Sequence, residues 1–166
     1  MPADLEAGQA GILDTNILIH WERLPARLLP DVGAVTAITF AELAAGVHAA
    51  LGAAELAERV DKLQRVESAF EPIPFDGDAA RAYGRVTAAV RAAGRSPRAR
   101  VADQMIAAIA ASRALPLYTT NPDDFAGLEG LLRVVAVPRP AAHWPWRVTA
   151  GSTPPSRRAH RRAAPA

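Results

Sequence analysis

The sequence has no cysteine and a single lysine, Lys62, among its 166 residues. The absence of cysteine excludes disulfide bonds, thiolate nucleophiles and zinc sites with cysteine ligands. Gly-rich phosphate loops of the G-x-G-x-x-G or Walker A type are also missing. The four histidines lie in unrelated segments, without the HxH, HxxxH or HExxH spacing of metal sites. Any metal site must therefore be built mainly from carboxylate and other oxygen ligands.

Long apolar runs are absent as well. No segment approaches the roughly 20 apolar residues that a membrane-spanning helix needs. The first residues include Asp4 and Glu6 and lack a continuous apolar stretch, so we expect no secretory signal. Half of the residues are apolar, which is enough for the core of one ordinary domain. These features predict a cytoplasmic, globular protein that is not inserted in a membrane.

The net charge of +2 conceals an asymmetry. From Pro138 onward there are six arginines and no acid, whereas the other 13 Lys and Arg face 17 acids, a net charge of −4. Pro, Ala, Ser and Arg also dominate this end of the chain, with Trp144 and Trp146 as its main candidates for local docking. We therefore predict a folded domain over residues 1–137 and a basic, mostly disordered tail over 138–166. The tail is either a solvated extension or a segment that binds phosphate groups.

The order of apolar patterns indicates an α/β fold. Segments 10–14, 32–38, 116–119 and 134–137 are short and apolar, which is typical of buried strands, and a further short strand is expected at 70–75. Helical spacing favours helices at 53–70, at 77–93 with Asp76 as N-cap, and from Ser96-Pro97 to Leu115. A short helix is expected at 125–132. Strands that alternate with helices predict a central parallel sheet with helices on both faces.

Four acidic residues stand in apolar surroundings: Asp14, Glu42, Asp103 and Asp124. Asp14 ends the first strand, where open α/β sheets place their ligands. Carboxylates in such surroundings are costly unless they are paired, hydrogen-bonded or bound to metal, so the set predicts a common pocket for a hard cation. Glu42 has a second explanation, because Thr39 is a plausible N-cap and a glutamate three residues later completes a capping box. Arg98 and Arg100, just ahead of Asp103, are candidates for contact with a phosphate.

In this order, the segments resemble the PIN-domain nucleases, in particular VapC-type toxins of bacterial toxin–antitoxin pairs. Ile12-Leu13-Asp14-Thr15-Asn16 resembles the opening D-T-N of the family, and Phe40-Ala41-Glu42-Leu43 its helical glutamate. The run 102–108 resembles its D-x-x-I-A-A helix, and 119–125 its T-x-N-x-x-D-F turn. The resemblance covers about Gly11 to Val137.

The resemblance implies an α/β/α sandwich and an endoribonuclease that depends on Mg²⁺ or Mn²⁺. It also implies a toxin homodimer and a VapB-type antitoxin that covers the site. Carried over by position, the catalytic and metal-binding residues would be Asp14, Glu42, Asp103 and Asp124. Asn16 and Thr119 would support them. Asp123 adjoins Asp124, and the Asp-Phe pairing favours Asp124.

Two other classes of function remain as alternatives. A haloacid-dehalogenase-like phosphatase also has an aspartate after its first strand, but it needs a second acid where this chain has Asn16, and it needs a lysine at the site. A non-catalytic α/β binding module would explain the fold but not the four acids.

Overall fold

The computed structural model describes residues 10–140. Its centre is a sheet of four parallel strands in the order β2-β1-β3-β4. The strands are short: β1 Ala10–Leu13, β2 Val32–Ala34, β3 Leu117–Thr119 and β4 Val134–Ala136. The predicted parallel sheet is therefore confirmed.

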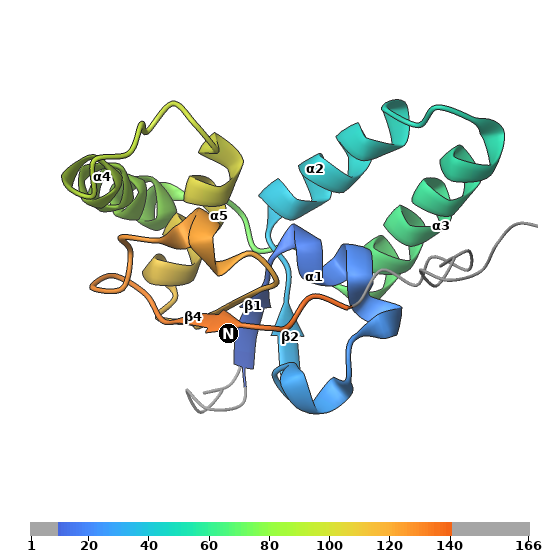
Figure 1. The fold of residues 1–166 in the computed structure, drawn as a ribbon, viewed down its shortest axis with the longest axis horizontal. Coiled ribbons are helices and arrows are strands. Elements are labelled where there is room, and N and C mark those ends of the chain that lie inside the picture. Colours follow the sequence, from blue (N-terminus) through green and yellow to red (C-terminus); the bar gives the residue numbers. More distant parts are fainter. Residues whose placement is uncertain (1–9, 141–166) are drawn as a thin grey trace, which may run out of the picture.

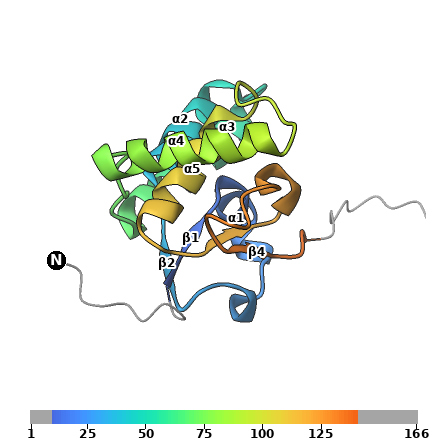
Figure 2. The same ribbon diagram turned by 90° about the vertical axis from the view of Figure 1, so that its left-hand side faces the viewer.

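Five α-helices lie around the sheet within residues 10–140. They are α1 Thr15–His20, α2 Ala37–His48, α3 Ala53–Ala69, α4 Gly77–Ala92 and α5 Val101–Ser112. Three short 3-10 helices complete the set: η1 Trp21–Arg23, η2 Ala26–Leu28 and η3 Pro122–Phe125. The pair α2 and α3 projects on one side of the molecule and the pair α4 and α5 on the other (Figure 1). Within the second pair, α4 lies across α5 (Figure 2).

The two faces of the sheet bury separate apolar clusters, because successive residues of a strand point to opposite faces. Ile12 of β1 and Leu117 of β3 pack with α4, α5 and the segment after η3. Leu13 and Tyr118, the next residues along, pack with α1, the 3-10 region that follows it and the end of α3. The result is the three-layer α/β/α sandwich that the resemblance implied.

Helix α2 begins three residues before the position that the sequence predicted. The hydroxyl of Thr36, rather than that of Thr39, caps the helix by accepting a hydrogen bond from the Thr39 backbone N–H at 3.1 Å. Strand β2 ends earlier than expected for the same reason, since Thr36 leaves it to form a parallel bridge with Ile73. That bridge is all that forms of the strand expected at 70–75. The capping-box explanation of Glu42 is therefore wrong.

Two further boundaries differ from prediction. Helix α5 starts at Val101 instead of Ser96-Pro97, because the Gln104 side chain donates to the backbone carbonyls of Pro97 and Ala99 and Arg100 adopts a left-handed conformation. The helix expected at 125–132 is replaced by η3 and turns. Asp76 does cap α4 as predicted, accepting hydrogen bonds from the first turn.

The predicted tail at 138–166, with Trp144 and Trp146, falls almost entirely outside the described residues, so the domain boundary stays a prediction. Within the described part of the chain, no helix is both long and apolar enough to span a membrane.

Candidate active site at the carboxyl edge of the sheet

Asp14 lies at the end of β1 with only 1% of its surface exposed. It caps α1, because its Oδ1 accepts a hydrogen bond from the Thr15 backbone N–H at 2.8 Å. Its Oδ2 accepts hydrogen bonds from the Thr119 hydroxyl at 2.7 Å and from the Asn16 amide at 3.4 Å. Burial nevertheless raises the pKa of Asp14, against the effect of these donors. The carboxylate is fixed in place but poorly compensated as an anion.

Glu42 reaches this site from α2. Its Oε2 accepts a hydrogen bond from the hydroxyl of Thr15, the residue that follows Asp14. Burial raises the pKa of Glu42, the Thr15 hydroxyl lowers it, and the charge of Asp14 raises it further. Thr15 therefore links two acids that are 28 residues apart in the sequence. Sequence reasoning did not assign a role to Thr15, although it is part of the D-T-N segment.

Asp103 and Asp124 come from the first turn of α5 and from η3. Their side chains are 18% and 12% exposed, and Arg100 contacts both. An Arg100 guanidinium nitrogen lies 2.6 Å from Asp124 Oδ2 and 3.5 Å from Asp103 Oδ2. The neighbouring Asp123 is exposed, so the orientation of the turn agrees with the choice of Asp124.

The four acids form one electrostatic unit, which we call the acidic cluster: Asp14, Glu42, Asp103 and Asp124. Burial raises the pKa of Asp103 to about 6, and the charges of the other three acids add to the effect. The charge of Asp124 also raises the pKa of Asp14. Mutual repulsion of this kind is typical of functional sites rather than of structural ion pairs.

The chemistry of the acidic cluster suits a hard divalent cation. Mg²⁺ and Mn²⁺ prefer carboxylate oxygens, and a cation would relieve the repulsion that raises these pKa values. In the arrangement of residues 10–140, however, no three Asp, Glu or His side chains are disposed around one ion position. Arg100 instead supplies the positive charge next to Asp103 and Asp124.

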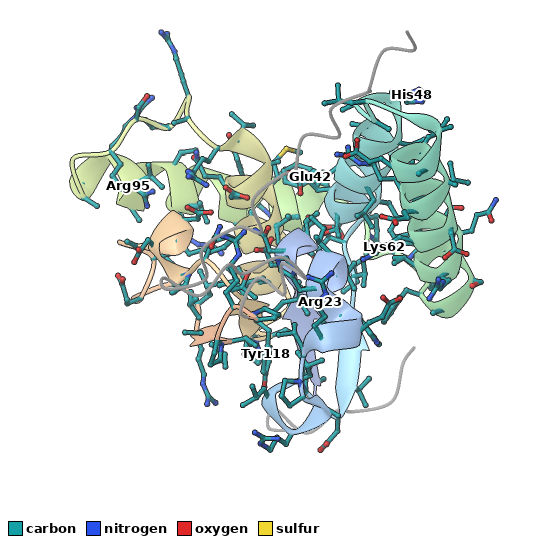
Figure 3. All side chains as sticks on the ribbon, turned by 45° about the vertical axis from the view of Figure 1, so that its right-hand side comes forward. Arg23, Glu42, His48, Lys62, Arg95 and Tyr118 are labelled. Atoms are coloured by element: carbon teal, nitrogen blue, oxygen red, sulfur yellow. The ribbon has the colours of Figure 1, made fainter. Side chains whose placement is uncertain are left out.

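A cleft of about 410 Å³ opens beside the acidic cluster, between α1, α2 and α3. Thr15 and Glu42 line its inner end, and His20, Arg23 and Lys62 also line it. Figure 3 shows Glu42 and Lys62 on the α2–α3 side of the molecule and Arg95 on the α4–α5 side. Burial and the nearby charges of Arg139, Arg23 and Lys62 lower the pKa of His20. Arg59, Glu55 and Glu58 line the cleft too, so its walls carry charges of both signs.

The only lysine does not belong to the acidic cluster. Lys62 lies on α3, and its Nζ donates a hydrogen bond to the backbone carbonyl of Ile19 at 2.6 Å. The phosphatase alternative needs a lysine at the site, so the geometry does not favour it.

Known proteins resemble this chain over most of its length. The PIN domain family model matches residues 11–131. Ribonuclease VapC5 from Mycobacterium tuberculosis is 44% identical over 128 residues, which are 75% of this chain and 92% of that protein.

Two solved structures agree with this result. A chain of VapBC-5, a member of the VapBC family of toxin–antitoxin systems from Mycobacterium tuberculosis, has 42% identity and a TM-score of 0.70, covering 78% of this chain and 99% of the other. A chain of the DNA-bound VapBC from Salmonella typhimurium has 26% identity and a TM-score of 0.60, covering 75% and 96%. The family match spans most of the chain, and the relative with 44% identity covers three quarters of it. This chain belongs to the PIN domain family.

Proposed function

We propose that this protein is a metal-dependent endoribonuclease and the VapC-type toxin of a toxin–antitoxin pair. The observation that carries the proposal is the acidic cluster, which draws one carboxylate from each of four separate segments to the carboxyl edge of the parallel sheet. The similarity to Ribonuclease VapC5 supports RNA as the substrate.

The cofactor in this proposal is Mg²⁺ or Mn²⁺, held by Asp14, Glu42, Asp103 and Asp124. Such an ion would activate water for attack on a phosphodiester and stabilise charge at the leaving oxygen. Carboxylates from separate elements suit this task, because a hard cation takes several oxygen ligands in octahedral geometry.

Other residues of the chain orient these carboxylates. Thr119 and Asn16 donate to one oxygen of Asp14, while the backbone of Thr15 donates to the other. The Thr15 hydroxyl fixes Glu42. Because these donors hold the carboxylates before any ligand binds, the site needs little rearrangement of Asp14 and Glu42.

The cleft between α1, α2 and α3 is the proposed path of the RNA strand beside the scissile phosphate. Arg23 and Lys62 can contact phosphates there, which would bind RNA without reading its sequence. In the cell we place the protein in the cytoplasm, with a VapB-type antitoxin that covers the site and with a second copy as homodimer partner. The VapBC complexes among similar structures support the antitoxin.

A cleavage assay tests the proposal. Purified protein is incubated with total cellular RNA in Mg²⁺, in Mn²⁺ and in EDTA, and new RNA ends are mapped. We expect metal-dependent cuts at defined positions that disappear in Asp14→Asn. Cleavage that persists in EDTA, or that Asp14→Asn leaves intact, would contradict the proposal.

A further inference from the structure

Arg100 has a backbone conformation that is unusual for a residue other than glycine. Its φ and ψ of 54° and 47° are left-handed, a region where residues other than glycine are uncommon. It occupies the N-cap position of α5, yet its side chain caps nothing. Non-glycine residues held in such conformations concentrate at functional sites, where the surrounding structure maintains them.

Gln104 provides that surrounding structure. Its side chain is nearly buried, with 5% of the residue exposed. Its amide donates to the carbonyl of Pro97 at 2.9 Å and to that of Ala99 at 2.6 Å, and its backbone N–H donates to the carbonyl of Arg100. The loop before α5 is therefore tied to the helix on both sides of Arg100, and these bonds help to hold its conformation.

This conformation directs the Arg100 guanidinium to two carboxylates at once. It lies 2.6 Å from Asp124 and 3.5 Å from Asp103, while 53% of the Arg100 side chain stays exposed. The guanidinium thus sits at the open side of the acidic cluster and can leave it without unfolding the loop. Arg98, two residues earlier, is exposed and forms no ion pair among residues 10–140.

We propose that Arg100 is an exchangeable counter-ion: it pairs with Asp103 and Asp124 in the free protein, gives way to a divalent cation there, and then pairs with a phosphate of the bound RNA. The exchange follows from competition, because the positive charge of the guanidinium beside Asp103 and Asp124 opposes the binding of a cation to the same carboxylates. A released arginine beside an occupied site meets the RNA backbone, whose phosphates accept the same planar hydrogen bonds as carboxylates. The RNA step rests on the proposed function, whereas the competition for carboxylates does not.

Binding of Mn²⁺ without RNA tests the competition. Calorimetric titration compares the wild type with Arg100→Gln, which removes the guanidinium, and with Arg98→Gln, which makes the same charge change at an arginine that has no ion pair with the cluster. We expect Arg100→Gln to bind Mn²⁺ about three- to fivefold more tightly, the upper part of the range expected for loss of a partly exposed charged pair. Arg98→Gln should stay within about twofold of the wild type.

The direction of the change decides the result. Mn²⁺ affinity that is equal or weaker in Arg100→Gln, or equally tighter in both variants, overturns the competition. If neither the wild type nor Arg100→Gln binds Mn²⁺, the proposed metal-dependent function fails as well. Circular dichroism in EDTA checks folding, and Arg100→Lys gives a second variant in which a smaller change of the same sign is expected.

RNA cleavage at saturating Mn²⁺ tests the second half of the exchange. Loss of one phosphate contact should make the slope of log kcat/KM against log salt less steep by about 0.7. We expect this change in Arg100→Gln, with KM raised more than kcat is lowered. An unchanged slope together with tighter Mn²⁺ binding would overturn the RNA contact and leave Arg100 as a counter-ion alone.

Discussion

Replacement of Asp103 by asparagine should stabilise the metal-free protein, although it removes a residue of the proposed active site. The pKa of Asp103 rises from 3.8 to about 6 in the folded state. A shift of that size destabilises the folded protein by up to about 3 kcal/mol at neutral pH. That figure already includes the contact with Arg100, which lowers the pKa of Asp103. Because the Asp103 side chain is 18% exposed and solvent screens its charge in part, we expect a net stabilisation of about 1 to 2 kcal/mol, or roughly 3 to 6 °C in Tm.

The pH dependence of this difference follows from the sign of the shift. Because the folded pKa is the higher one, the unfolded chain loses its proton first as the pH rises. The wild type should match the mutant below the unfolded pKa of 3.8 and lose stability relative to it as the pH rises from there through about 6. Above that pH the difference in free energy of unfolding should stay constant. A divalent cation reverses the order, since wild type should gain about 2.7 kcal/mol at a concentration 100 times its Kd and the mutant less.

Differential scanning fluorimetry of both proteins measures these effects, in EDTA across pH 4 to about 8 and with Mg²⁺ or Mn²⁺ at neutral pH. A structural Asp103 would give the opposite result. The mutant would then be less stable in EDTA and melt at a lower temperature, because a lost buried hydrogen bond costs about 1 kcal/mol or more. Added metal would stabilise the mutant as much as the wild type. That outcome would refute the assignment of Asp103 to a cation site.

Three further predictions test other parts of the molecule. Asp14→Asn and Asp124→Asn should each abolish metal-dependent RNA cleavage and leave the circular dichroism spectrum unchanged. Replacement of the exposed Asp123 by asparagine should keep most of the cleavage activity. If Asp123→Asn were inactive and Asp124→Asn active, the turn would be assigned one residue off. Backbone hydrogen bonds from α4 and the side chain of Arg113, the residue after α5, lower the pKa of Asp76. Its contribution to stability should therefore be complete above pH 4 and vanish as the pH falls below that value. Asp76→Ala should lower the Tm at neutral pH and Asp76→Asn should lower it less, whereas a Tm unaffected by either would count against the cap. Truncation after Pro140 should leave the Tm nearly unchanged but weaken RNA binding and its salt dependence, and a large fall in Tm would place the tail in the core.

The comparison between prediction and structure is clearest at Glu42 and Arg100. Glu42 lies in an ordinary helical segment, and local spacing allowed either a capping role or a site role. Thr36 pairs with Ile73, a contact between distant segments, and α2 begins directly after Thr36. Glu42 therefore lies beyond the first turn of α2, where it accepts a hydrogen bond from Thr15 instead of capping the helix. The left-handed Arg100 could not be foreseen either, because it depends on the buried side chain of Gln104 in the following helix.

The sequence by itself determined the order of the four sheet strands and the five α-helices, the parallel sheet and the choice of the four acids. These follow from local patterns: apolar runs, caps such as Asp76 and short motifs around carboxylates. Tertiary structure decided which groups meet. Three contacts depend on the tertiary structure in this way: the Thr119 hydroxyl with Asp14, the Thr15 hydroxyl with Glu42, and the Arg100 guanidinium with Asp103 and Asp124. The first two join distant segments, and the third requires a left-handed backbone, so no local pattern specifies them. Parallel strands bring their carboxyl ends to one edge whatever their separation in sequence, and the helices that follow then fix each carboxylate against its neighbours.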